Sequence, residues 1–217
     1  MAAMSPWSVV VPAKRLAVAK TRLRPLTEHV PDLHDALVLA LLADTVAAAV
    51  ACPLVADVVV VTDEPAAADL VGGLGARSVA DRPDRGLNAA LEHGAGEATT
   101  EAVAALSSDL PALRPAELAA ALGAAGAGRC FVADAQGSGT TLLTAVGVPL
   151  RPRFGRDSAQ AHRQDGAVPL TGDWPGLVRD VDTPDDLRAA VALGVGGRTR
   201  ALLGASPTLA VHLGAAR

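Results

Sequence analysis

Aromatic residues are nearly absent from the sequence, whose 217 residues include two phenylalanines, two tryptophans and no tyrosine. Basic runs are absent too, and the formal net charge is -4. A nucleic-acid-binding protein needs a cationic surface, and single strands also need aromatic platforms on which bases stack. The composition therefore argues against a nucleic-acid partner. A polyanionic ligand would have to be bound locally, by a few placed cations, by backbone amides or by a metal ion.

Metal-binding patterns of cysteine and histidine are missing as well. Cys52 and Cys130 are the only cysteines, and the five histidines include no His-x-x-x-His pair. This spacing argues against a zinc site. Because the sequence shows no secretion signal, we expect both cysteines to be buried, reduced thiols rather than a disulfide.

The sequence also lacks long apolar runs and targeting segments. No window reaches ~18 consecutive apolar residues, and the first strand-like run, "SVVVPAK", lacks the flanks of a signal peptide. We therefore expect a soluble, cytoplasmic protein with no membrane partner. Half of the residues are hydrophobic and 19% are charged, which is typical of a folded domain. The length predicts a single domain over residues 1–205, followed by a C-terminal extension over 206–217.

Strand-like runs alternate with alanine-rich helical runs up to residue 134, which predicts an α/β fold. The run "VVVV" is apolar without alternation, as expected for a strand buried on both faces of a parallel sheet. We expect the run over 130–134 to close this open sheet, and the shorter runs after it to form a hairpin and an insertion that cap the sheet and form a pocket. The predicted strands are 8–13, 57–63, 76–81, 103–109 and 130–134, and the predicted helices are 31–50, 65–72, 86–97 and 115–124.

The segment after the first strand, "PAKRLAVAKTRL", contains four cations. Ligands of open α/β sheets bind beyond the carboxyl ends of the strands, and cations there suit the phosphates of a nucleotide. A solvated basic loop is the alternative interpretation. The sequence contains neither a dinucleotide-binding glycine fingerprint after this strand nor a Walker A motif. The candidate phosphate-binding residues are Lys14, Arg15, Lys20 and Arg22.

Three aspartates are candidate metal ligands. Asp109, in "SSDLPAL", is predicted at the carboxyl end of a central strand, too far from the next helix to cap it. Asp180 and Asp182 lie two residues apart in the extended run "LVRDVD", so their side chains leave one face while Val181 points into the core. Adjacent carboxylates repel each other, and a divalent cation removes this cost. Hard oxygen ligands favour Mg²⁺.

The acidic residues that follow need no functional explanation. In "DTPDDL", Thr183 fits the N-cap of a helix and Pro184 its first position. Asp185 and Asp186 then lie in the first turn, where negative charge interacts favourably with the helix dipole.

Two glycine-containing segments could bind an anion. In "ADAQGSGT", small residues would let backbone amides approach a ligand, and Thr140 would add a hydroxyl donor, although an ordinary turn explains the pattern too. In "FGRDSAQAHR", Gly155 frees the backbone, and Asp157 or Ser158 could cap a short helix whose first amides bind a carboxylate or phosphate. Capping alone explains Ser158 equally well. His162 is either packed, which we favour, or a support for the site.

The sequence contains, in this order, the five blocks "VVPAKRLAVAKTRL", "SDLPAL", "FVADAQGSGTTLL", "RPRFGRDSAQAHR" and "RDVDTPDDL". Together they resemble the guanylyltransferases of coenzyme F(420) biosynthesis, which act on 2-phospho-L-lactate or phosphoenolpyruvate. The resemblance implies a single-domain nucleotidyltransferase fold, an α/β/α sandwich like that of the nucleotide-diphospho-sugar transferases, with a mostly parallel central sheet. Ser108 departs from the glycine frequent in the family. The implied catalytic and metal-binding residues are Asp109, Asp180 and Asp182, and the implied substrate contacts are Thr140, Gly155 and Ser158, with GTP phosphates at the loop from Lys14.

The reaction implied by the resemblance joins two anions. The phosphate of phosphoenolpyruvate attacks the α-phosphorus of GTP, pyrophosphate leaves, and the product, enolpyruvoyl-2-diphospho-5′-guanosine, passes to the next enzyme of the pathway. The alanine-rich composition suggests a high-GC actinobacterial source, which favours phosphoenolpyruvate over 2-phospho-L-lactate. The alternatives are a nucleotidyltransferase for another small phosphorylated acid or a sugar phosphate, a glycosyltransferase, and a catalytically dead nucleotide-binding module. The late position of Asp-x-Asp counts against a glycosyltransferase, and the three retained carboxylates count against a dead module.

Overall fold

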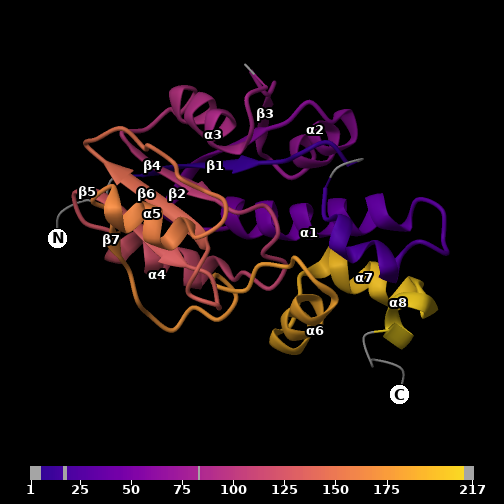
Figure 1. Ribbon diagram of the computed structural model, residues 1–217. Coiled ribbons are helices and arrows are strands. Elements are labelled where there is room, and N and C mark those ends of the chain that lie inside the picture. Colours follow the sequence, from indigo (N-terminus) through magenta and orange to yellow (C-terminus); the bar gives the residue numbers. More distant parts are fainter. Residues whose placement is uncertain (1–5, 17–18, 83, 213–217) are drawn as a thin grey trace.

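The computed structural model describes residues 6–16, 19–82 and 84–212 (Figure 1). A seven-stranded sheet with the order β3-β2-β1-β4-β6-β5-β7 forms its centre. Strands β1 to β4 pair in parallel, and only β6 runs antiparallel to its neighbours. The expected α/β fold with a mostly parallel sheet is therefore confirmed. The strands are β1 (Trp7–Pro12), β2 (Val55–Val61), β3 (Arg77–Val79), β4 (Ala102–Leu106), β5 (Gly128–Ala133), β6 (Thr140–Val146) and β7 (Val168–Pro169).

The second half of the sheet differs from the prediction. We expected the run over 130–134 to close the sheet, but β6 lies between β4 and β5, and β7 pairs with β5 beyond it. The hairpin that forms here is β5 with β6, so its first strand is the run expected to close the sheet, and its second strand enters the sheet instead of capping it. Residues 140–145 are buried throughout, which is typical of an interior strand.

Helices cover both faces of the sheet. In β1, Trp7, Val9 and Val11 pack in a cluster with residues of α1, α2 and α4, whereas Val10 packs on the opposite face with residues of α3 and α5. Figure 1 shows α1 and α3 on opposite sides of β1. The helices are α1 (Leu33–Val50), α2 (Pro65–Gly72), α3 (Leu87–Gly96), α4 (Pro115–Ala124), α5 (Ser158–Gln164), α6 (Pro184–Leu193), α7 (Gly197–Ala205) and α8 (Pro207–His212), with a 3-10 helix, η2 (Thr21–Leu26).

Helix α1 is apolar around its whole circumference. It is the one described helix long and apolar enough to cross a membrane by length and composition, but 67% of that window is buried within the protein. Leu42 and Val46 contribute to the cluster at the sheet, while Leu37 and Leu41 contribute to a second cluster on the other side. Burial on two sides explains the composition, so we interpret α1 as a core helix.

The second cluster, here called the end cluster, joins segments from both ends of the chain. It lies where α6, α7 and α8 gather beside α1 (Figure 1). In the segment expected to be an extension, the described residues form α8, whose Leu209 is fully buried in this cluster. The members of the end cluster are Leu23, Leu26, Leu33, Leu37, Leu41, Ala112, Val181, Leu187, Ala190, Val195 and Leu209.

Asp44 attaches α7 to α1. This buried carboxylate accepts hydrogen bonds from the backbone amides of Arg198 and Thr199, both at 2.9 Å. These are amides of the first turn of α7, so a side chain from a distant helix takes the role of the N-cap. The two cysteines are buried free thiols, as predicted.

Candidate active site

A pocket of about 390 Å³ opens at the carboxyl ends of β1 and β4. The chain continues from β1 to β2 on one side and reaches β4 on the other, so the strand order reverses at this point. Open α/β sheets bind ligands at such switch points. Predicted residues from three separate segments line the pocket: Lys14, Lys20, Arg22, Asp109 and Asp182.

Asp109 lies beyond the strand that was predicted to contain it. Strand β4 ends at Leu106, and the chain then turns through residues 107–111 instead of remaining extended to 109. The amide of Leu110 donates to Thr45 Oγ1 at 2.9 Å, which fixes the turn against α1. Helix α4 begins only at Pro115, so the carboxylate of Asp109 does not cap it. Asp109 is 8% exposed and faces the pocket.

The segment that carries Asp180 and Asp182 forms no strand. The extended run predicted over 177–182 consists of turn and loop, because its backbone joins no ladder of the sheet. A single backbone hydrogen bond, from Val181 N–H to the Asp109 carbonyl at 3.1 Å, attaches it to the turn after β4. Val181 is fully buried, as expected, and the two aspartates flank it. The alternation of side chains was thus predicted correctly, although the element was wrong.

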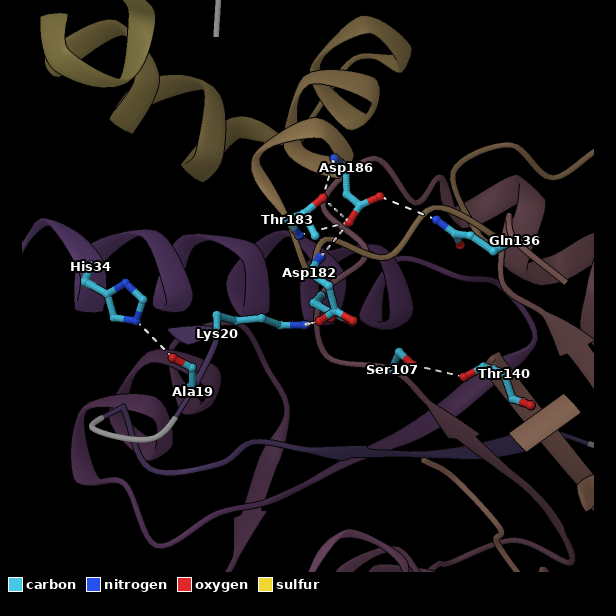
Figure 2. Close-up of polar contacts among 10 residues, drawn as sticks. Ala19, Lys20, His34, Ser107, Gln136, Thr140, Asp182, Thr183 and Asp186 are labelled. Carbon is cyan, nitrogen blue, oxygen red and sulfur yellow. Dashed lines mark hydrogen bonds and ion pairs between the residues drawn. The ribbon is translucent and has the colours of Figure 1, made fainter. Parts of the chain in front are cut away.

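Lys20 bridges two of the three predicted metal ligands. Its Nζ forms an ion pair with Asp109 and lies 2.6 Å from Asp182 Oδ1 (Figure 2). Burial alone would lower the pKa of Lys20, but the two carboxylates raise it above its ordinary value. Lys20 adopts a left-handed backbone conformation, with φ of 47°, at the start of η2. This conformation belongs to the small allowed region that non-glycine residues occupy only uncommonly.

Asp180 is the member of the triad that forms no ion pair with any described residue. Burial raises its pKa to about 7, and the charges of Asp109 and Asp182 add to the rise. No described residue donates a hydrogen bond to its carboxylate. For Asp182, burial acts in the same direction, but Lys20 and Arg22 outweigh it and lower the pKa. The three carboxylates therefore lie close enough to repel one another, and one ammonium group offsets part of that charge.

The donor set suits a hard divalent cation, although the described side chains are not gathered around one. Among them, no group of three or more His, Cys, Asp or Glu residues has a metal-holding arrangement. The three aspartates offer carboxylate oxygens, and Asp180 has a raised pKa and no hydrogen-bond partner among the described residues, which fits a cation that would lower the mutual repulsion. A metal ion at Asp109 and Asp182 would have to take the place of Lys20 Nζ.

The predicted basic loop divides between two pockets. Lys14 and Arg22 line the main pocket, whereas Arg15 turns to an adjoining pocket of about 340 Å³ that shares Lys14. There the guanidinium of Arg15 lies 3.3 Å from Asp63 and 3.8 Å from Asp84. Lys14, Arg15 and Arg22 are exposed, as a solvated loop would be, whereas Lys20 is held at the predicted metal ligands.

Thr140 and Ser158 come together with a histidine that the sequence did not assign to the site. Thr140 Oγ1 lies 2.9 Å from His162 Nδ1 and 3.2 Å from Ser158 Oγ, and all three side chains are buried. Ser107, which lines the main pocket, approaches the Thr140 carbonyl with its hydroxyl at 3.4 Å (Figure 2). His162 is packed, as favoured, but it is also hydrogen-bonded. Its position four residues after Ser158 was the available signal.

The backbone amides that we expected to meet an anion already have partners. The amides of Ser138 and Gly139 donate to the carboxylate of Asp134 at 2.9 and 2.8 Å. The Ala159 amide donates to the Ser138 carbonyl at 3.0 Å, so the start of α5 is also occupied. Asp157 is the N-cap residue of α5, but no side-chain hydrogen bond caps the helix. The expectation of an amide-lined anion site was therefore wrong, because these amides stabilise the two loops.

Gly155 lies in the loop before α5, and its φ of +131° is accessible essentially to glycine alone. The preceding residue, Phe154, is fixed by two hydrogen bonds: its amide donates to Asn88 Oδ1 at 2.8 Å, and its carbonyl accepts from Asn88 Nδ2 at 3.0 Å. Phe154 lines the main pocket. The loop is thus positioned by α3, and Gly155 allows it to turn toward Ser158.

The predicted helix start at 183 is confirmed. Thr183 is the N-cap of α6, and its hydroxyl oxygen accepts a hydrogen bond from the Asp186 amide at 3.3 Å. The Asp186 carboxylate accepts in return from the Thr183 amide at 2.9 Å (Figure 2). Asp185 is exposed and pairs with Arg188. Asp185 and Asp186 thus stabilise the helix, while Asp182 turns to Lys20.

Known proteins resemble this chain over nearly its whole length. A phosphoenolpyruvate guanylyltransferase from Geodermatophilus obscurus is 68% identical over 214 residues, covering 96% of this chain and 100% of that protein. One from Streptomyces coelicolor is 56% identical over 203 residues, covering 90% and 95%. A solved nucleotidyl transferase from Methanothermobacter has the same fold, with a TM-score of 0.58 at 21% identity over 88% of this chain and 98% of its own.

These likenesses agree with the resemblance carried by the five sequence blocks and with the nucleotidyltransferase fold. Residues 7–205, from the first strand to the end of α7, match a family model described as guanylyl transferase CofC like. The chain belongs to the CofC-like family of guanylyl transferases.

Proposed function

We propose that this protein transfers the guanylyl group of GTP to phosphoenolpyruvate, giving enolpyruvoyl-2-diphospho-5′-guanosine and pyrophosphate. The observation that carries the proposal is the convergence of Lys20 with Asp109 and Asp182 in a pocket at the switch point of the sheet. The names of the relatives support the choice of substrates. The predicted cytoplasmic location and the transfer of the product to a following enzyme remain predictions.

The chemistry requires neutralisation of charge more than proton transfer. A phosphate monoester is largely dianionic at neutral pH, so the attacking oxygen needs no general base. Both reactants are anions, and the cost of bringing them together falls if cations surround the reacting phosphates. Lys14 and Arg22 line the pocket and are placed to bind the phosphates that leave as pyrophosphate.

Asp109, Asp180 and Asp182 are the residues that would hold Mg²⁺. When bound, Mg²⁺ supplies positive charge to the phosphate oxygens that become more negative during the transfer. Lys20 would then leave the carboxylates, and its ammonium group would stay near enough to interact with the same phosphates. The chain thus keeps one positive charge in the site whether or not the cation is bound.

The acid is proposed to bind at Thr140, Gly155 and Ser158. Thr140 and Ser158 supply hydroxyl groups, and Gly155 gives the loop before α5 its turn. Ser107 and Phe154 line the main pocket and contact this region, so the acid and the nucleotide can meet at the same edge of the sheet. Orientation of the acid phosphate toward the α-phosphorus of GTP is the role of these residues.

The test is a matrix of incubations of the purified protein with Mg²⁺, each of the four nucleoside triphosphates, and phosphoenolpyruvate or 2-phospho-L-lactate, with pyrophosphate release as the readout. We expect release with GTP and phosphoenolpyruvate above all other pairs. A preference for 2-phospho-L-lactate would make that acid the proposed acceptor substrate. The absence of release from every pair would refute the transferase assignment.

A further inference from the structure

A buried chain of hydrogen bonds connects the loop before α5 to the proposed acid site. The amide of Arg153 donates to His162 Nε2 at 2.9 Å, and His162 Nδ1 lies 2.9 Å from Thr140 Oγ1. Ser158 Oγ lies 3.2 Å from the same Thr140 oxygen. His162, Ser158 and Thr140 are 1%, 1% and 6% exposed. Water therefore has little access to these groups, and the protein itself fixes their donor and acceptor roles.

The first contact fixes the tautomer of His162. A backbone amide can only donate, so Nε2 must carry a lone pair and accept. Burial lowers the pKa of His162 to about 4, so the ring is neutral at physiological pH. A neutral imidazole whose Nε2 accepts has its proton on Nδ1. The contact between Nδ1 and Thr140 is therefore a hydrogen bond that the histidine donates and the threonine oxygen accepts.

The hydroxyl protons of Thr140 and Ser158 can now be counted. The two hydroxyl groups have two protons, and their mutual hydrogen bond uses one of them. The hydrogen bond from His162 to Thr140 uses the proton of the histidine and therefore neither hydroxyl proton. Among the described residues, neither oxygen has another hydrogen-bond partner. One hydroxyl proton of the pair thus has no acceptor among the described residues, whichever of the two groups donates in the mutual bond.

A buried donor without an acceptor is costly, because desolvation is not compensated. This donor lies behind two residues that line the main pocket: Ser107 contacts the Thr140 carbonyl, and the Phe154 ring packs edge-on against the His162 ring with centroids 5.3 Å apart. The missing acceptor is therefore expected to be a ligand group, and an anionic oxygen forms the stronger hydrogen bond.

We propose that His162 is a positioning residue that occupies an acceptor site of Thr140, so that the remaining hydroxyl proton of the Thr140–Ser158 pair is directed to an oxygen of the acid substrate. The proposal rests on the proposed function for the identity of that acid. The backbone amide of Arg153 has a role as well, because it sets the tautomer of His162, although the side chain of Arg153 is exposed. A histidine that was only packed would not need a defined tautomer.

The first test is spectroscopic and needs no turnover. Long-range ¹H–¹⁵N correlation spectra of the ¹⁵N-labelled protein assign the proton to Nδ1 or Nε2 of His162. We expect a neutral ring with the proton on Nδ1. A proton on Nε2, or a charged ring at pH 7, would overturn the proposal, since Thr140 would then no longer be the acceptor as described.

The second test separates positioning from packing. His162→Phe removes the donor to Thr140 but keeps an aromatic ring, and we expect the KM for phosphoenolpyruvate to rise on the order of tenfold or more, with the KM for GTP near that of the unchanged protein. His162→Asn can place an amide donor near the former Nδ1 and should restore part of the loss. Gln160→Ala, on an exposed position of α5, is the matched control and should change neither KM.

Equal rises in both KM values for His162→Phe and His162→Asn, together with lower thermal stability, would show a purely structural role. If the Phe variant does not fold, the Asn variant and the tautomer still decide the question. Absence of turnover in the unchanged protein would refute the proposed function instead. The tautomer assignment would then still test the donor arrangement by itself.

Discussion

The ammonium group of Lys20 lies 2.6 Å from the carboxylate of Asp182, a residue 162 positions further along the chain. Lys20 thereby occupies the place at which a metal ion would contact Asp109 and Asp182. Any cation that binds these carboxylates competes with a group of the protein itself. The ion pair also protects the site from the repulsion of its own aspartates before a ligand arrives.

Lys20→Met should therefore bind Mg²⁺ more tightly in the absence of nucleotide, while turnover falls because a positive charge at the phosphates is lost. Unpaired carboxylates should also lower the melting temperature of the metal-free variant. Calorimetric titration with Mg²⁺ and thermal unfolding with and without the ion measure both effects. Equal Mg²⁺ affinity in the variant and the parent would contradict competition by Lys20.

Asp180→Asn and Asp182→Asn should abolish turnover, because each removes a proposed metal ligand. Asp185→Asn is the matched control: Asp185 lies three residues further along the chain, but it is exposed and paired with Arg188. It should retain nearly full activity, with at most a few tenths of a kcal/mol lost at the start of α6. Steady-state pyrophosphate release measures all three, and similar losses at all three positions would refute the division of this acidic segment.

The contribution of His162 to stability should decrease as the pH falls. Burial lowers its pKa to about 4, a hydrogen bond to the Ser158 backbone and the charge of Asp165 oppose this shift, and Arg153 and Arg129 add to it. The unfolded chain, with an ordinary histidine pKa of about 6.5, binds more protons at this residue than the folded one between these values, so the contribution of His162 is lost as the pH falls from about 6.5 to about 4. Asp180, whose pKa is raised to about 7, contributes in the opposite direction over this range. In chemical denaturation, the free energy of unfolding of the parent minus that of His162→Asn should therefore decrease as the pH falls across this range.

Gly94→Ala should destabilise the protein. A Cβ at this position of α3 would lie 2.5 Å from Val10 Cγ1 and 2.6 Å from Val61 Cγ2, on strands that cannot move away without disturbing the sheet. Overpacking of this kind costs about 1–3 kcal/mol. Gly96→Ala, in the same helix and with no atom within 4 Å of the added Cβ, is the control and should be neutral or slightly stabilising. Urea denaturation curves of the two variants would test the difference.

Local signals in the sequence predicted the elements that they control directly. Helices α2 and α4 begin at Pro65 and Pro115, and both have the predicted bounds, because proline at the first helical position fixes where a helix starts. The start of α6 at Pro184, with Thr183 as its N-cap, was predicted from the sequence in the same way. Each of these features depends on residues only a few positions apart.

Features that depend on distant partners were not predictable in the same way. The position of β6 between β4 and β5 is decided by pairing across the sheet, which no local pattern encodes. One local interaction was also missed: the amides of Ser138 and Gly139 donate to the carboxylate of Asp134, four and five residues earlier in the chain. The segment around Val181 has the alternation of a strand, but its backbone forms isolated hydrogen bonds to two separate loops, from Val181 to Asp109 and from Ala135 to Val178, instead of a ladder.

The end cluster contains residues adjacent in the chain to the charged groups of the pocket. Leu23 follows the loop of Lys20, Ala112 follows the turn of Asp109, and Val181 separates the two late aspartates, and all three side chains pack in the same apolar group. Detachment of the C-terminal helices from α1 would therefore loosen every charged segment of the pocket together. The charged segments of the pocket share one apolar cluster with the C-terminal helices, so we expect local unfolding of these helices to disturb all of these segments together rather than one contact at a time.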